Sequence, residues 1–144
     1  MSFEIKTAEL KDLAWINATY HTIHFLPSTL KNEMVAIAYV DGIKVGLGRI
    51  AVVDRYSCEL GGMYVHPEFR ERKIARQIVP FLLDHAQKRV IYCIPFENLS
   101  RFYESFGFRK VGSDLLTPVK IRKKLEFTKR AYSEPTLLLV LIRG

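Results

Sequence analysis

The order of β-prone and helical segments predicts an α/β (α+β) fold, with one mixed, mostly antiparallel, twisted sheet of about seven strands flanked by helices. The length of 144 residues suits one domain, residues 1–144, which is long enough to bury a core. A hydrophobic content of 49% with 12% aromatic residues excludes a disordered chain. No Pro/Gly/Ser-rich linker or internal repeat interrupts the pattern, which again favours a single domain.

In the first half of the chain, a strand and a helix precede three strands. Alternation of apolar and polar residues predicts a strand at residues 3–7, and apolar spacing predicts a helix over about residues 10–25. Further strands are expected at residues 34–40, 43–53 and 57–65. Asp41-Gly42 joins two of these strands, and both central residues of a type I′ turn need positive φ. The three strands are therefore expected to form an antiparallel meander.

In the second half, helices and short strands alternate. Helices are expected at residues 70–88, 98–106 and 118–130, and strands at residues 89–95, 108–112 and 136–142. Pro80 lies inside the first helix, where it removes one backbone hydrogen bond and is expected to kink the helix. Gly107 is a natural residue to end the second helix. Thr117 is expected to cap the third helix, with Pro118 at its first position.

The net charge indicates the kind of partner, and the cysteines indicate the redox state of the compartment. Twenty-two Lys and Arg against fifteen Asp and Glu give a net charge of +7, which favours an anionic partner without separating a phosphate ligand from nucleic acid or membrane. No apolar run reaches the roughly 18–20 residues that span a bilayer, and the first residues lack a leader peptide, so a cytoplasmic protein without a membrane partner is expected. Cys58 and Cys93 lie in predicted strands, which suits inert thiols in a reducing compartment.

The most informative segment, residues 59–78, runs from a strand through a tight turn into a helix. Four cations crowd the turn and the expected first helical turn: Arg70, Arg72, Lys73 and Arg76. A helix N-terminus presents unpaired N–H groups and a positive dipole end, so it binds phosphate or pyrophosphate well. Cations at this end oppose the dipole, and a bound anion is the simplest compensation. A solvated surface turn explains the same residues about equally well.

Two motifs in this chain resemble the GNAT superfamily of acyl-CoA-dependent N-acyltransferases. The stretch Tyr64-Val-His-Pro-Glu-Phe-Arg70-Glu-Arg-Lys73-Ile-Ala75 is similar to the family's pyrophosphate motif, Arg/Gln-x-x-Gly-x-Gly/Ala, at Arg70 and Ala75, and it departs from that motif at Lys73. A residue other than glycine at position 73 predicts an ordinary helical φ, with the amide still directed at phosphate and the side chain adding charge. The second stretch, Phe102-Tyr103-Glu-Ser-Phe-Gly107-Phe108, resembles the family's Phe-Tyr-x-x-x-Gly-Phe helix end.

The resemblance implies direct transfer of an acetyl group from acetyl-CoA, as cosubstrate, to an unidentified amine acceptor, with no metal. It places a backbone donor for the thioester oxygen at a bulge near residues 63–65, which Gly61-Gly62 would permit. The cofactor-binding residues that it implies are Met63, Tyr64, Val65, Arg70, Glu71, Arg72, Lys73, Ile74, Ala75, Arg76 and Asn98. For Asn98 the proposed ligand is the pantetheine arm, although the family's usual asparagine position is held here by Phe96.

The resemblance also implies a catalytic pair, Glu59 and Tyr103. Glu59 lies eleven residues before Arg70, where several family members carry a glutamate base, but it could equally be an exposed strand residue or a salt-bridge partner. His66 and Asp54 are the fallback bases, and water can serve instead. Tyr103 is expected to protonate the leaving thiolate, and its alternative role is that of a packed core tyrosine.

Two other classes of function stay open. One is a GNAT-like module that binds acyl-CoA or a protein partner without turnover. The other is a nucleic-acid-binding protein, suggested by the basic run Lys120, Arg122, Lys123, Lys124, Lys129 and Arg130. His21 and His24 have no partners at metal-site spacing. The resemblance places the acceptor groove in residues 18–31 and 112–134, and a homodimer is left open.

Overall fold

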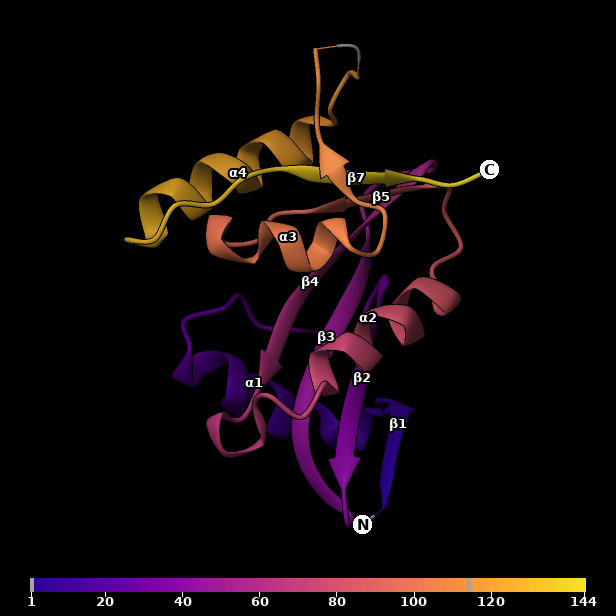
Figure 1. Ribbon diagram of the computed structural model, residues 1–144, viewed down its shortest axis with the longest axis vertical. Coiled ribbons are helices and arrows are strands. Elements are labelled where there is room, and N and C mark those ends of the chain that lie inside the picture. Colours follow the sequence, from indigo (N-terminus) through magenta and orange to yellow (C-terminus); the bar gives the residue numbers. More distant parts are fainter. Residues whose placement is uncertain (1, 114) are drawn as a thin grey trace. The chain divides into compact units, whose positions relative to one another are not determined.

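The computed structural model describes residues 2–113 and 115–144, so Met1 and Asp114 lie outside the described residues. These residues form a seven-stranded sheet in the order β1-β2-β3-β4-β5-β7-β6, with four α-helices (Figure 1). The sheet is mixed and mostly antiparallel, as predicted. The chain divides into a first compact unit, Met1–Ala51 with Gly62–Ala86, and a second, Val52–Gly61 with Gln87–Gly144. Strand β4 (Ser57–Val65) contributes to both units.

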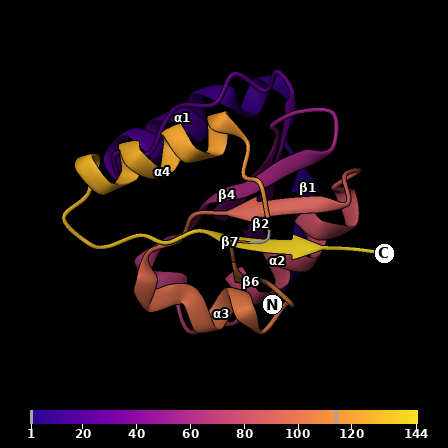
Figure 2. The ribbon, with the colours of Figure 1, turned by 90° about the horizontal axis from the view of Figure 1, so that it is seen from above.

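The first unit contains three antiparallel strands and two helices. Its elements are β1 (Phe3–Thr7), α1 (Leu13–Thr22), β2 (Glu33–Val40), β3 (Ile43–Val52) and α2 (Ile74–His85). Strand β2 pairs with β1 on one side and β3 on the other, antiparallel in both cases. Helices α1 and α2 lie on opposite faces of these strands (Figures 1 and 2).

Alternation along the strands sets the two faces of the first unit. Val35, Ile37 and Leu47 are buried in one cluster with Ile16 and Tyr20 of α1. The intervening residues serve α2, since a Cβ built on Gly48 would lie 3.0 Å from a methyl group of Leu82 and 3.1 Å from one of Ile78. The glycines of β3 therefore let α2 approach the sheet closely.

The second unit is built around short strands. Its elements besides β4 are β5 (Val90–Cys93), α3 (Ser100–Glu104), β6 (Arg109–Lys110), α4 (Val119–Ala131) and β7 (Leu139–Ile142). The first half of β4 pairs in parallel with β5, and β7 pairs antiparallel with both β5 and β6. Helices α3 and α4 lie on opposite faces of β5 and β7 (Figures 1 and 2), and the α4 face buries Tyr92, Ile121 and Val140.

Several local predictions are confirmed. Strand β4 has the predicted bounds, and the hairpin residues Asp41 and Gly42 have φ values of 49° and 80°. Gly107 follows α3 with a φ of 103°, as a helix-ending glycine should. Pro80 lies inside α2. No helix in the described part of the chain has the length and apolar content needed to cross a membrane.

Other boundaries were predicted wrongly. Helix α2 begins at Ile74 and not at residue 70, because Glu71 and Lys73 adopt positive φ and the chain cannot continue as a right-handed helix through them. Helix α4 begins at Val119, and Pro118, not Thr117, occupies its N-cap position. The first helix is shorter than predicted, since residues 10–12 form a 3₁₀ turn and α1 ends at Thr22.

Candidate functional site

The turn that leads into α2, which we call the phosphate turn (residues 70–76), belongs to the first unit. Lys73 occupies the N-cap position of α2 with φ 61° and ψ 24°, and Glu71 has φ 64°. The expectation of an ordinary helical φ at Lys73 is therefore wrong. The backbone holds at this position the left-handed conformation that glycine adopts most easily, although a Lys is present. Left-handed residues alternating with others form concave backbone sites that suit anions.

The positive end of the α2 dipole is not compensated by a residue of its own first turn. This turn contains no acidic residue, and the Lys73 side chain makes no capping hydrogen bond. Its leading N–H groups thus lack a capping side chain, and the dipole end is positive. Arg70 and Arg72 are exposed and lie against aromatic rings, at 5.5 Å from Tyr64 and 4.9 Å from Phe69. These contacts limit the freedom of both guanidinium groups near the turn.

Strand β4 is distorted just before the residues assigned to the thioester oxygen. Gly62 has φ 60°, outside the strand region, and its carbonyl accepts a 2.8 Å hydrogen bond from the Tyr20 hydroxyl. Downstream, the strand resumes, and Arg70 Nε donates to the Val65 carbonyl at 3.0 Å. A backbone distortion at this point turns peptide groups out of the regular ladder.

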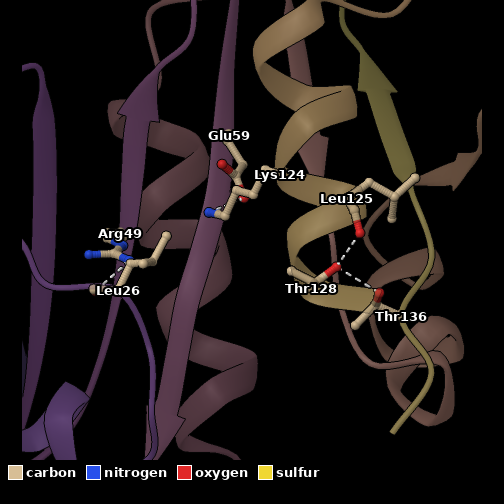
Figure 3. Close-up of polar contacts among 7 residues, drawn as sticks. All are labelled: Leu26, Arg49, Glu59, Lys124, Leu125, Thr128 and Thr136. Carbon is tan, nitrogen blue, oxygen red and sulfur yellow. Dashed lines mark hydrogen bonds and ion pairs between the residues drawn. The ribbon is translucent and has the colours of Figure 1, made fainter. Parts of the chain in front are cut away.

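In the second unit, Glu59 is paired with a lysine. Its side chain is 10% exposed, and Oε2 accepts a 2.7 Å hydrogen bond from Lys124 Nζ on α4 (Figure 3). Lys124 therefore orients the carboxylate through Oε2. This geometry matches the salt-bridge alternative.

Tyr103 is buried in α3, with ring contacts to Phe102 at 5.0 Å and Phe108 at 6.1 Å between centroids. Burial raises the pKa of its phenol well above the usual value, and the neighbouring Cys93 raises it further. A phenol with a raised pKa stays protonated throughout the neutral range, so it can donate a hydrogen bond or a proton. Burial also raises the pKa of Cys93, which keeps that thiol unreactive.

The fallback bases are both engaged in turns. Asp54 Oδ1 accepts from the Ser57 hydroxyl and from the N–H groups of Tyr56 and Ser57, each at 2.8 Å, and these bonds lower its pKa. His66 Nδ1 accepts from the Glu68 N–H at 3.3 Å and caps the 3₁₀ turn at Pro67–Phe69. Neither arrangement favours proton abstraction from an amine.

Asn98, the residue expected to contact the pantetheine arm of CoA, lies in a short turn. Asn98 is exposed in the 3₁₀ turn Glu97–Leu99. Phe96, at the family's asparagine position, packs edge-on against Tyr132 at 5.4 Å and bridges to Thr136. Among residues 2–113 and 115–144, no three His, Cys, Asp or Glu side chains cluster as metal ligands.

Sequence reasoning missed two residues. Lys124 was grouped with the basic run, although its spacing of three from Ile121 places it beside the buried stripe of α4. Arg49 lies inside the apolar strand β3 and is only 8% exposed. A single Arg within a run of apolar strand residues is the signal that could have revealed it.

The chain matches the family model described as acetyltransferase (GNAT) domain over residues 31–110, which is more than half of its length. It therefore belongs to the GNAT acetyltransferase family. No significant match to a curated protein sequence is found.

Solved structures with this fold include three informative examples. N-acetylglutamate synthase from Neisseria gonorrhoeae, complexed with coenzyme A and N-acetyl-glutamate, gives a TM-score of 0.77 at 16% identity over 100% of this chain and 36% of the synthase. A Mycobacterium tuberculosis protein in complex with CoA gives 0.75 at 19% identity, over 98% of this chain and 99% of that one. The ribosomal-protein-S18-alanine N-acetyltransferase from Escherichia coli gives 0.70 at 16% identity, over 99% and 96%.

These likenesses concern the fold. The chain spans about a third of the length of the Neisseria synthase structures that it matches, 36% of one and 33% of the other. Together with the family match, they identify the sheet and its flanking helices as a GNAT fold, as the resemblance implied.

Proposed function

We propose that residues 1–144 form one N-acetyltransferase domain, which transfers an acetyl group from acetyl-CoA to an amine by direct attack through a tetrahedral intermediate. Membership of the GNAT family supports the reaction class. The observation that carries the proposal is the left-handed Lys73 at the N-cap of α2, where the family's pyrophosphate motif has glycine. The two free, buried cysteines agree with a cytoplasmic setting.

The phosphate turn is suited to pyrophosphate by its backbone and by its charge. A left-handed lysine costs about 1–2 kcal/mol relative to a right-handed one, and such strain persists where the surrounding structure imposes it. The uncapped N-terminus of α2 and the exposed Arg70 and Arg72 offer N–H donors and positive charge to the same kind of ligand. A bound pyrophosphate would offset the repulsion between these cations and the helix dipole.

The chemical roles are assigned to residues of β4 and the second unit. Glu59, oriented by Lys124, accepts the amine proton directly or through water, since a Lys-like amine with a pKa near 10.4 is mostly protonated at pH 7. A backbone N–H within residues 63–65 stabilises the thioester oxygen. Tyr103 delivers a proton to the leaving thiolate of CoA.

Arg70→Ala and Arg72→Ala test the phosphate turn. Each should weaken CoA binding by about tenfold, because one charge-assisted contact to pyrophosphate is lost. Isothermal titration should show the same factor for CoA and for 3′-dephospho-CoA, because both ligands retain the pyrophosphate. Arg55→Ala, which removes an equal charge from an exposed loop, is the matched control and should bind like wild type. Unchanged binding by both test variants contradicts the assignment.

Turnover separates the enzyme from its alternatives. Release of free CoA thiol from acetyl-CoA in the presence of a panel of amines supports catalysis. Tight CoA binding with no thiol release across the panel supports a non-catalytic acyl-CoA module. A salt-dependent gel shift with nucleic acid that CoA does not compete away supports the nucleic-acid alternative.

A further inference from the structure

Arg49 of β3 is a buried cation with an unused donor. Only 8% of its surface is exposed, and Nη1 is the one buried side-chain polar atom without a hydrogen-bond partner among residues 2–113 and 115–144. Nη2 donates to the carbonyl of Leu26 at 3.0 Å (Figure 3). Among these same residues, no carboxylate forms an ion pair with Arg49 within 4.0 Å. A buried guanidinium without a carboxylate partner is unfavourable unless something else neutralises it.

The neighbours of Arg49 hold the guanidinium in a fixed place. Its Cζ lies 4.6 Å from the centroid of the Tyr20 ring, and the Tyr20 hydroxyl is committed to the Gly62 carbonyl. A Cβ on Gly62 would lie 2.9 Å from Arg49 Nε, so the guanidinium lies directly against the distorted point of β4. The donor is therefore beside the strand segment assigned above to the thioester oxygen.

We propose that Arg49 binds the carboxylate of the acceptor, so that the acceptor is an amine bearing a carboxylate, such as an amino acid. This proposal rests on the proposed acetyltransferase function. A carboxylate has two oxygens that match the fork of the guanidinium, and its single charge balances that of one arginine. A dianionic phosphate carries twice the charge of the one guanidinium and fits less well.

A carboxylate that pairs with both terminal nitrogens takes the unpartnered Nη1 and replaces the Leu26 carbonyl at Nη2. Leu26 lies in the segment between α1 and β2, two residues after His24, which adopts positive φ. Left-handed residues other than glycine make this conformation costly to hold. Asn17 holds this segment at Ser28 through hydrogen bonds of 2.9 Å and 2.7 Å. Only the residues before Ser28 therefore need to move when the Leu26 carbonyl is replaced. The neutral carbonyl is then replaced by a charge-assisted partner, which is the stronger bond.

Binding can be measured without turnover. The Nε–Hε NMR signal of Arg49, assigned by its loss in Arg49→Lys, should shift and saturate when wild-type protein is titrated with N-acetylglycine. N-acetylglycinamide, which has the same shape without the charge, should leave it in place. An Arg49 signal that does not respond to the carboxylate overturns the proposal, whatever the enzyme acetylates.

Kinetics give the second measurement. Wild type should prefer glycine, alanine and glutamate over the corresponding α-carboxamides by at least about tenfold in kcat/KM, and Arg49→Gln should abolish that preference. Lys6→Gln, which removes an exposed charge from the same unit, should keep it. If the α-carboxamides are acetylated with the same kcat/KM as the amino acids, the Arg49 assignment is wrong while the acetyltransferase function stands. If no CoA is bound or consumed, the proposed function fails, and the NMR titration still decides the Arg49 assignment.

Discussion

The cations of the phosphate turn in the first unit are exposed, whereas the candidate base and acid of the second unit are buried. Arg70, Arg72 and Lys73 are exposed, and the shape of their turn comes from local backbone conformation. Glu59 and Tyr103 are 8% and 4% exposed, and residues distant in the sequence fix their positions. Exposed cations beside the backbone N–H groups of a turn can set the affinity for an anion. Buried and oriented side chains can instead accept or donate a proton. Substitutions in the phosphate turn should therefore change CoA affinity, and those at Glu59 and Tyr103 should change turnover.

Glu59→Gln should show the largest effect. The amide keeps the shape but cannot accept the amine proton, so kcat should fall by about 10²–10⁴-fold while CoA affinity stays close to wild type. The dependence of kcat/KM on pH should also differ from that of wild type. A stopped assay of thiol release at a series of pH values measures turnover, and isothermal titration measures CoA affinity.

Lys124→Met separates the base from the ion pair. If Glu59 acts as the base, this variant keeps turnover, although the pair between Lys124 Nζ and Oε2 is gone. A loss of stability in Glu59→Gln and Lys124→Met that is not additive in the double variant measures the ion pair itself. Should Glu59→Gln turn over at the wild-type rate with an unchanged profile, Glu59 is only the partner of Lys124.

Tyr103→Phe should reduce turnover by roughly 10- to 10³-fold, because the ring packing against Phe102 and Phe108 remains and only the proton donor is lost. Since burial raises its pKa well above the usual value, Tyr103 should add no alkaline limb to the profile below about pH 10. Tyr92→Phe, a buried tyrosine of the same unit, is the matched control and should keep full activity. A folded Tyr103→Phe variant with the wild-type rate contradicts the role, and an unfolded one shows that the hydroxyl is structural.

Local patterns predicted the fold well where the chain follows local rules. The Asp41-Gly42 turn and the bounds of β4 came from such patterns. The start of α2 could not be read correctly, because a lysine in left-handed conformation breaks the rule that links that conformation to glycine. The partner of Glu59 could not be read either, because 65 residues separate it from Lys124 and only the tertiary fold joins them.

Each unit contains an aspartate with a lowered pKa, and the interactions that lower it differ between the two units. In the first unit, Asp12 accepts the Glu9 N–H at 2.8 Å and pairs with Lys44 at 3.1 Å, and the backbone hydrogen bond is the main cause of its lowered pKa. In the second, the Ser57 hydroxyl and two N–H groups lower the pKa of Asp54. A carboxyl whose pKa is lower in the folded state stabilises the protein above pH ~4, and that stability is lost as the pH falls further.

The two aspartates should therefore respond differently to salt. Asp12→Asn and Asp54→Asn should each lower the thermal midpoint at pH 7 by about 2–4 °C and make it less sensitive to acid. Added salt at 1 M should shrink the effect of Asp12→Asn, because it screens Lys44, and should change that of Asp54→Asn less. Calorimetry at low and high salt makes the comparison, and equal salt sensitivity of the two variants contradicts it.

The smallest expected effect concerns the backbone of the phosphate turn. Lys73→Gly removes the cost of a left-handed lysine but adds freedom to the unfolded chain, so the net gain in the free energy of unfolding should be about 0.5 kcal/mol. Lys73→Ala keeps the left-handed strain and also loses the charge, so it should be less stable than Lys73→Gly by about 1 kcal/mol, the reverse of the order inside an ordinary helix. Lys73→Asn should fall between them, since asparagine tolerates this conformation better than alanine. Urea unfolding midpoints rank the three variants.

The same three variants also test how Lys73 contributes to CoA binding. All three should weaken CoA binding equally if Lys73 contributes only charge. Tighter binding by Lys73→Gly than by Lys73→Ala shows instead that the backbone of the turn contacts the pyrophosphate. Greater stability of Lys73→Ala than of Lys73→Gly contradicts the left-handed conformation on which the phosphate-turn assignment depends.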